Sequence, residues 1–235
     1  MAVILNIDTS TAVCSVALTA EGAVMYHLED TKGRNHAALL SGFIKQCLDF
    51  LADKESRLDA VAVGIGPGSY TGLRIGLSEA KGLAYALNIP LIGIPTLLTM
   101  AVSVMFSHDV DESTLFAPMI DARRMEVYTA VYDMALNEVM PPAPLILDEK
   151  SYSEFFDRRV LLFGDGSDKA KSVISHPNAE FIDGIVPLAV DMLALSERAF
   201  RDGDFLDLAY STPTYLKDYQ AIRPRNPLES LLDEQ

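Results

Sequence analysis

A glycine-rich segment between an apolar run and a helical pattern most constrains how this chain can fold. Residues 61–65 form a short apolar run of the kind found in buried strands. Residues 66–69 (Gly-Pro-Gly-Ser) interrupt that run, and residues 71–87 have the apolar spacing of a helix. A strand that turns tightly into a helix leaves unpaired N–H groups at the helix start, which favour an anion or a carbonyl oxygen. The segment therefore predicts an α/β scaffold of the kind that holds phosphate groups.

The same loop lacks the residues with which such scaffolds usually grip phosphate. No lysine follows a glycine in it, so the Gly-Lys-Ser/Thr pattern is absent. No third glycine completes a dinucleotide fingerprint from either Gly64 or Gly66. The loop therefore predicts the scaffold of a nucleotide site without its reactive groups.

Histidine and cysteine spacing argues against a metal site. A helical metal pair needs two histidines three or four residues apart, and this spacing is missing. Cys14 and Cys47 lie in apolar patterns without CxxC spacing, which is typical of buried free thiols. The four histidines are His27, His36, His108 and His176.

The charge balance and the apolar runs limit the partners and the compartment. With 19 basic and 33 acidic residues, the net charge is −14, and such a surface repels phosphate backbones over roughly 8 Å at physiological salt. We expect no direct, tight binding of nucleic acid. The apolar run at residues 3–7 is too short for a signal segment, and no stretch approaches the ~18 apolar residues of a membrane span. We therefore expect a cytoplasmic protein.

The order of predicted elements indicates two lobes. Residues 1–106 follow a β-β-β-α-β-α-β-α order, which is typical of a mixed sheet covered by helices. The acidic loop 107–113 is the best candidate boundary. Beyond it, residues 119–121 (Met-Ile-Asp) lead into a turn and a strand, as residues 6–8 (Asn-Ile-Asp) do. This echo falls where a duplicated domain would place it.

The second half divides less clearly. We expect a C-terminal lobe over residues 107–217, with an amphipathic helix at 187–201 packing back on the first lobe, and a tail at 218–235. The prolines of 141–144 predict a loop. Asn35 and Ser167 are expected as N-caps of the helices that follow them.

Polar residues after the first strand and the glycine turns could contact phosphate. The sequence Asp-Thr-Ser-Thr at 8–11 could hold a metal–phosphate group, or it could form a hydroxyl or Asx turn that closes the hairpin, and spacing alone favours the turn. The candidate phosphate contacts are Asp8, Thr9, Thr11, Gly66, Gly68 and Gly164.

Small residues recur every four positions along the predicted helix at 71–87. Gly72, Gly76, Ala80 and Ala84 form a smooth ridge against which another backbone can pack closely. This ridge could pack on the chain's own sheet or first helix, or on a partner's helix. Leucines on its other sides make the helix apolar on more than one face, which favours a partner. On that reading, Gly76→Arg should block pairing while leaving the fold intact.

Several of these motifs together resemble the TsaB (YeaZ) family. They are residues 4–11 (Ile-Leu-Asn-Ile-Asp-Thr-Ser-Thr), 66–76 (Gly-Pro-Gly-Ser-Tyr-Thr-Gly-Leu-Arg-Ile-Gly), 120–123 (Ile-Asp-Ala-Arg) and 213–217 (Pro-Thr-Tyr-Leu-Lys). The resemblance runs over nearly the whole chain. It implies an α/β fold of the actin/Hsp70/sugar-kinase type, with two related lobes that each have a mixed β-sheet covered by helices.

The resemblance also implies a function. It implies a non-catalytic subunit that supports the paralogue TsaD in forming threonylcarbamoyladenosine at position 37 of tRNAs that read codons beginning with A. The ATPase TsaE is implied as a further partner, and no catalytic residue, metal or cofactor is implied for this chain. Where TsaD has a His-x-x-x-His helix, this chain has His36 followed by Leu40.

The family's dimerisation helices correspond to residues 36–52 and 71–87. A homodimer through the same helices is expected to be possible when the partner is missing. The alternative function is an ATP-dependent small-molecule kinase of the same fold, with the candidate phosphate contacts as its clamp. The residues expected at a partner interface are His36, Leu40, Phe43, Cys47, Gly72, Leu73, Gly76, Leu77, Ala80 and Ala84.

Overall fold

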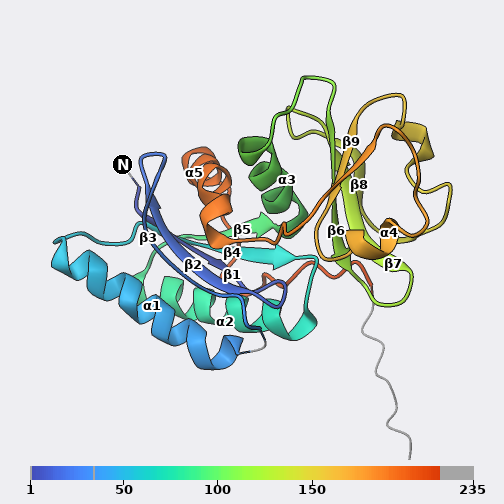
Figure 1. Ribbon diagram of the computed structural model, residues 1–235. Coiled ribbons are helices and arrows are strands. Elements are labelled where there is room, and N and C mark those ends of the chain that lie inside the picture. The colour runs from blue at the N-terminus through green and yellow to red at the C-terminus, as the bar shows by residue number, and fades with distance from the viewer. Residues whose placement is uncertain (1, 34, 218–235) are drawn as a thin grey trace, which may run out of the picture.

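Two lobes, each built on a five-stranded sheet, make up the computed structural model, which describes residues 2–33 and 35–217 (Figure 1). No helix within these residues is long and apolar enough to cross a membrane.

The first sheet combines an antiparallel meander with two parallel strands. Its strand order is β3-β2-β1-β4-β5. The meander joins β1 to β2 and β2 to β3, whereas β4 runs parallel to both β1 and β5. Because helices cover both faces of the central strands, β1 is buried at every residue, including the polar Asn6 and Asp8. The strands are β1 (Ile4–Asp8), β2 (Cys14–Ala20), β3 (Ala23–Asp30), β4 (Ala60–Gly66) and β5 (Leu91–Pro95).

The second sheet repeats the topology of the first. Its order is β10-β9-β6-β7-β8, so β6 occupies the place of β1 and each later strand the place of its counterpart. The pairing directions also match, since β6–β7 and β7–β8 are antiparallel while β6–β9 and β9–β10 are parallel. The prediction of two related lobes with mixed sheets is therefore confirmed. The strands are β6 (Leu115–Asp121), β7 (Glu126–Tyr132), β8 (Glu138–Ile146), β9 (Val160–Phe163) and β10 (Ala179–Ile182).

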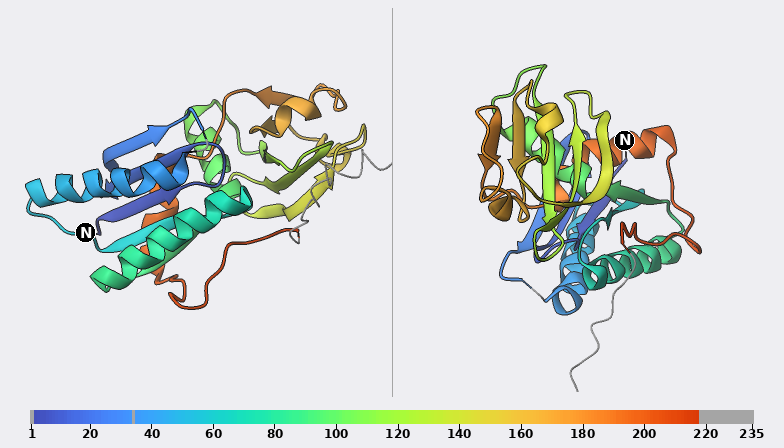
Figure 2. Two further views of the ribbon diagram at one scale, coloured as in Figure 1. Left: turned by 90° about the horizontal axis from the view of Figure 1, so that it is seen from below. Right: turned by 90° about the vertical axis from the view of Figure 1, so that its right-hand side faces the viewer.

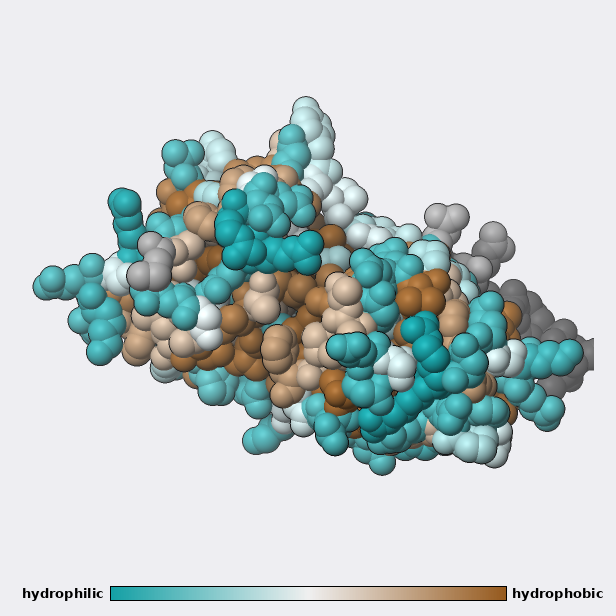
Figure 3. All heavy atoms as spheres, turned by 90° about the horizontal axis from the view of Figure 1, so that it is seen from above, coloured by the Kyte–Doolittle hydropathy of each residue, from teal (hydrophilic) through white to brown (hydrophobic). Residues whose placement is uncertain are grey.

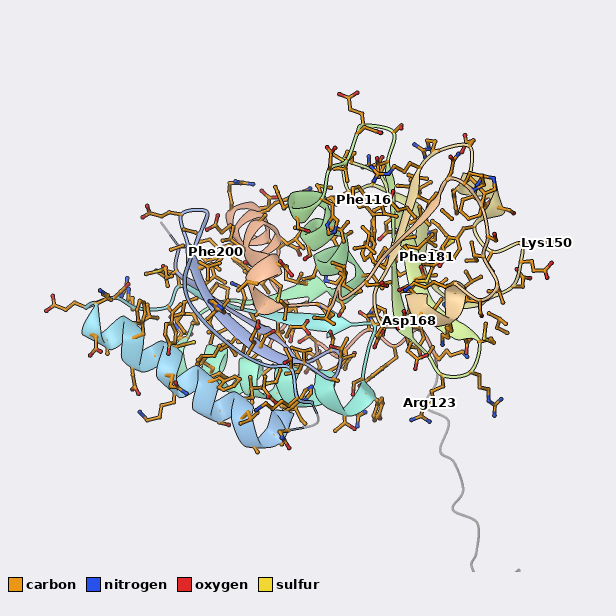
Figure 4. All side chains as sticks on the ribbon, viewed as in Figure 1. Phe116, Arg123, Lys150, Asp168, Phe181 and Phe200 are labelled. Atoms are coloured by element: carbon orange, nitrogen blue, oxygen red, sulfur yellow. The ribbon has the colours of Figure 1, made fainter. Side chains whose placement is uncertain are left out.

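Helices cover the first sheet on both faces. Two of them, α1 (His36–Asp53) and α2 (Tyr70–Leu87), lie side by side on one face, as Figure 2 shows from below. On the other face lie α3 (Thr96–Ser107) and α5 (Leu193–Asp202) (Figure 1). The apolar residues of α3 also pack against the second sheet, where the buried ring of Phe116 is labelled in Figure 4. This helix therefore joins the two lobes.

Two of the predictions about helix starts are wrong, and a third is confirmed in position. Residues 187–201 do not form one helix, because a 3₁₀ turn at Ala189–Met192 precedes α5. The cap predicted at Ser167 is instead the first residue of α4 (Ser167–Ala170), and its hydroxyl donates to the carbonyl oxygen of Gly164. Asn35 does stand at the N-cap of α1, but its side chain makes no capping hydrogen bond.

The prolines of residues 141–144 lie in a strand and not in the predicted loop. They belong to β8, which pairs with β7 alone and forms the edge of the second sheet. An edge strand tolerates proline because half of its N–H groups point away from the sheet and need no partner strand. Two register shifts in the β7–β8 pairing accommodate the irregular backbone.

The ridge of small residues on α2 faces inward, which corrects the expectation that it forms a surface for a partner. Gly72, Gly76, Ala80 and Ala84 are all buried. A methyl group added at Gly76 would overlap the hydroxyl oxygen of Thr9, and one added at Gly72 would overlap the Thr9 carbonyl oxygen. The glycines are thus needed so that α2 can approach the end of β1 closely. An arginine at Gly76 would displace this part of the core.

Two glycines of α2 should respond oppositely to alanine. We expect Gly76→Ala to lower the free energy of unfolding by about 1–3 kcal/mol, because the new methyl group overpacks against Thr9. Gly82→Ala should raise it by about 0.5–1 kcal/mol, because a methyl group there meets open space and alanine favours the helix. Urea denaturation of both variants measures this difference. Equal effects of the two substitutions would contradict the assigned packing of α2.

Candidate functional site

A cleft of about 1230 Å³ lies between the lobes. The first lobe lines it with the β1–β2 turn and with the starts of α1 and α2. The second lobe contributes the β6–β7 hairpin, whose tip residue Arg123 is labelled at the lower edge of that lobe in Figure 4. Asp165, in the turn after β9, and the segment 215–217 complete the lining. The cleft is thus built mainly from turns that follow β1, β4, β6 and β9.

Hydrogen bonds fasten the β1–β2 turn to the glycine loop. One carboxylate oxygen of Asp8, Oδ1, accepts the backbone N–H of Ser10 at 3.0 Å and the Ser10 hydroxyl at 2.8 Å. The carbonyl oxygen of Ser10 accepts the N–H of Ser69 at 2.6 Å. The hydroxyl of Thr9 donates to the carbonyl oxygen of Gly72 at 2.8 Å. A carbonyl oxygen of the chain itself, one of the two acceptors that the sequence pattern favours, therefore meets the loop before α2.

Glycine is required in this loop because other backbone segments approach it. A side chain at Gly68 would overlap the carbonyl oxygen of Ser10. At Gly66, φ is +108°, and a Cβ atom would lie 2.8 Å from the carbonyl oxygen of Thr214. Both glycines thus serve the packing of the chain on itself.

The candidate phosphate contacts do not converge on one site. Asp8 and Thr9 are fully buried beneath the cleft, and Gly66 is buried under Thr214. Gly164 belongs to the second lobe and lines a separate cavity of about 430 Å³. Among the six candidates, only Thr11 and Gly68 line the cleft.

The opposite wall of the cleft uses the same turn device as the first lobe. Asp121 at the end of β6 accepts the N–H of Arg123 at 3.1 Å, just as Asp8 accepts that of Ser10 two residues on. Both Arg123 and Arg124 have left-handed backbone, with φ of 69° and 51°. Lys169 stabilises this hairpin by pairing with Asp121 and donating to the carbonyl oxygen of Arg124 at 2.9 Å.

Asp8 is the most electrostatically unusual group near the cleft. Its side chain is fully buried, and its second oxygen, Oδ2, has no hydrogen-bond partner and lies against the backbone of Gly64. Burial raises the pKa of Asp8 to about 7, and the nearby negative charge of Asp191 adds to the rise. Asp191 has its own pKa raised to about 6, mainly by burial. Near neutral pH, Asp8 is therefore part protonated.

The residues at the start of α1 serve the first lobe internally. The Nε2 atom of His36 lies 2.8 Å from the carbonyl oxygen of Thr11, and Leu40 is fully buried in the core. Across residues 2–33 and 35–217, no three histidine, cysteine, aspartate or glutamate side chains gather into a group that could hold a metal ion.

The outward face of α1 and α2 includes small residues that the sequence patterns did not indicate. Of the ten residues expected at a partner interface, nine are buried inside the first lobe and Phe43 is half-buried. The signal that could have identified the outward face is the set of small residues between the apolar positions of each helix. Seven exposed small residues on the two helices have this spacing, namely Ala37, Ala38, Ser41, Gly42, Ser78, Gly82 and Ala86.

Comparison with known proteins identifies the family. A family model described as TsaD, tRNA N6-adenosine threonylcarbamoyltransferase, matches residues 30–146. The tRNA threonylcarbamoyladenosine biosynthesis protein TsaB of Escherichia coli (strain K12) is 31% identical over 224 residues, which cover 92% of this chain and 94% of that protein. The chain belongs to the TsaB family.

Further members agree with this assignment. The TsaB protein of Bacillus subtilis (strain 168) is 33% identical over 175 residues, or 73% of this chain and 74% of that protein. The solved structure of YeaZ from Pseudomonas aeruginosa, 28% identical, matches with a TM-score of 0.79 over 92% of this chain and 100% of that one. The resemblance read from the sequence motifs is therefore confirmed, as is the two-lobe fold that it implied.

Asp8 should make the stability of the chain depend on pH. Folding raises the pKa of Asp8 from 3.8 to about 7. Between these two pH values, the folded chain therefore retains a proton that the unfolded chain has released. The contribution of this proton to the free energy of unfolding is complete below about pH 4 and is lost as the pH rises through 7. We expect the wild-type chain to lose on the order of 2 kcal/mol of unfolding free energy from this group between pH 5 and pH 8, a loss that Asp8→Asn abolishes.

Denaturation in urea at the two pH values measures this effect. Asp204→Asn, at an exposed aspartate, is the matched control and should keep the wild-type pH dependence. A wild-type pH dependence in Asp8→Asn would show that the buried carboxyl is not the titrating group.

Proposed function

We propose that this chain is a non-catalytic subunit that binds TsaD and supports it in forming threonylcarbamoyladenosine at position 37 of tRNAs that read codons beginning with A. TsaE is proposed as a further member of the assembly. The names of the relatives support the pathway, because they are tRNA threonylcarbamoyladenosine biosynthesis proteins. The match of residues 30–146 to the TsaD family model supports descent from a shared ancestor with TsaD.

The burial of Asp8 and Thr9 at the β1–β2 turn supports the non-catalytic part of the proposal. The hydroxyl of Thr9 is bonded to the carbonyl oxygen of Gly72, and the carboxyl of Asp8 is fully buried. A ligand in the cleft could not reach the Thr9 hydroxyl without breaking its contact with α2, and the Asp8 carboxyl is buried against Gly64. These two residues, which could otherwise hold a metal–phosphate group, therefore contribute to folding and not to chemistry.

The outward face of α1 and α2 supports binding to a helical partner. The two helices lie side by side (Figure 2), and the Ser41 hydroxyl joins them by donating to Glu79 at 2.8 Å. Side chains built at Gly42 and Gly82 would meet open space. Small residues on two adjacent helices form a smooth surface onto which the helices of TsaD can pack closely.

The alternative of an ATP-dependent kinase is supported only by the cleft. Thr11 and Gly68 line it, and its volume would admit a nucleotide. The remaining groups of the expected clamp lie outside it, as Asp8 and Thr9 are buried and Gly164 lines another cavity. The geometry therefore favours the role of a binding subunit.

Arginine on the outward face should block pairing with TsaD. We expect Gly82→Arg and Gly42→Arg each to weaken binding of purified TsaD at least tenfold, because a long charged side chain stands where the partner's helices approach. Both variants should melt no lower than the wild type, since the new side chains meet open space. Isothermal titration calorimetry and thermal melting measure the two effects.

Ser175→Arg is the matched control, because it adds the same side chain at an exposed position of the second lobe. Wild-type affinity in both glycine variants would remove the α1–α2 face from the interface. Failure of the wild-type chain to bind TsaD at micromolar concentration would overturn the proposed function itself.

A further inference from the structure

The segment after α5 runs back across the first lobe to the cleft. We call residues 204–217 the C-terminal strap. In Figure 2, seen from below, it passes along the flank of α2 towards the second lobe. Backbone hydrogen bonds fix it to the edge strand β5 and to the neighbouring strand β4 of the first sheet. The N–H of Leu206 donates to the carbonyl oxygen of Leu91 at 2.8 Å, and that of Thr214 donates to Ile65 at 2.8 Å.

Two basic side chains of α2 anchor the strap further. The ammonium group of Lys81 donates to the carbonyl oxygen of Ser211 at 2.7 Å. The Nε atom of Arg74 donates to the hydroxyl of Tyr215 at 3.0 Å, and the Arg74 guanidinium lies 4.1 Å from the centre of the Tyr70 ring. The rings of Tyr70 and Tyr215 are 5.0 Å apart. Every one of these contacts is to the first lobe.

The last described residue of the strap crosses to the second lobe. The ammonium group of Lys217 pairs with Oε2 of Glu126 at 2.5 Å. Glu126 is the first residue of β7, and its side chain is only 17% exposed. Residues 107–182, which include all five strands of the second sheet, carry seven basic and fourteen acidic side chains, so a cation delivered by the strap complements the charge of this lobe.

A different kind of contact joins the lobes at the other end of β7. The hairpin that follows Tyr132 places Leu136 against the apolar cluster of the first lobe under α3 and α5. Leu136 has a left-handed backbone, with φ of 61°, and the carboxylate of Asp133 holds this turn by accepting the N–H groups of Ala135 and Asn137, each at 2.9 Å. Figure 3, a view from above, shows apolar side chains gathered in the middle of the upper face of the molecule.

The two junctions differ in how easily they open. The Leu136 junction is apolar packing by a half-buried side chain, which salt does not weaken, whereas the Lys217–Glu126 pair is a partly exposed ion pair that exchanges with water and salt. Because these junctions lie at opposite ends of β7, separation at Glu126 lets the second lobe turn about the Leu136 end.

We propose that the C-terminal strap is a latch that holds the interlobe cleft closed through Lys217 and Glu126. Tyr215, Leu216 and Lys217 form part of the cleft lining, so release of the latch both removes that wall and widens the cleft. Arg74 and Tyr215 hold the strap in place for the latch, which makes Arg74 a positioning residue. The latch belongs to the chain alone and does not depend on TsaD.

A tryptophan reporter and a pair of spin labels test the latch. The chain contains no tryptophan, so Leu216→Trp gives a single emission signal from the cleft wall. Cysteines introduced at the exposed Ser78 and Glu149 place one label on each lobe, while the native Cys14 and Cys47 are buried. Double electron–electron resonance (DEER) then measures the distribution of distances between the two labels, and so between the lobes.

Lys217→Glu should broaden that distribution towards longer distances and shift the tryptophan emission to the red. The exchange Lys217→Glu with Glu126→Lys should restore both signals, because it recreates the pair in reverse. Arg74→Met should produce the same open state as Lys217→Met, and combining these two should add nothing further. Lys45→Met, which removes an exposed ion pair on α1, is the matched control and should leave both signals unchanged.

Thermal melting and circular dichroism of each variant establish that it is folded. Wild-type distances and emission in folded Lys217→Glu would overturn the proposal. So would an exchange variant that stays open, or additive effects of Arg74→Met and Lys217→Met.

Discussion

The contact between the β1–β2 turn and the start of α2 is the interaction on which the rest of this structure depends. The parallel pairing of β1 with β4 brings the turn beside the glycine loop, and Thr9 and Ser10 then bond to the backbone at the start of α2. Only glycine at positions 68, 72 and 76 leaves room for this approach. The same contact directs the small-residue ridge inward and so decides which side of α2 remains outside.

The two lobes use one turn design with different outcomes. In the first lobe, Asp8 bonds to Ser10 and is buried against Gly64, with Asp191 nearby, so burial governs its protonation. In the second lobe, the equivalent Asp121 stays exposed and is paired with Lys169. The same strand-to-turn motif therefore packs inside the first lobe, whereas in the second lobe it forms a hairpin that lines the cleft.

Local patterns predicted most of the elements, and tertiary contacts explain what they missed. The apolar spacing of 36–52 predicted α1 to within one residue, because that stripe is the face that packs on the sheet. Pro141 and Pro144 predicted a loop, since a sequence does not show that a strand will lie at an edge. Spacing revealed the ridge at Gly72 and Gly76 but not which backbone would meet it. The strap has no periodicity that could have indicated its path.

Asp8 and Thr9, the side chains at the end of β1 that could hold a metal–phosphate group, are enclosed by the chain itself. Calorimetric titration of the isolated, purified chain with ATP and magnesium tests this enclosure most directly. We predict no measurable binding up to millimolar nucleotide. Stoichiometric binding that is lost on replacing Thr9 by valine would contradict it, because the Thr9 hydroxyl would then have to leave Gly72 and reach the ligand.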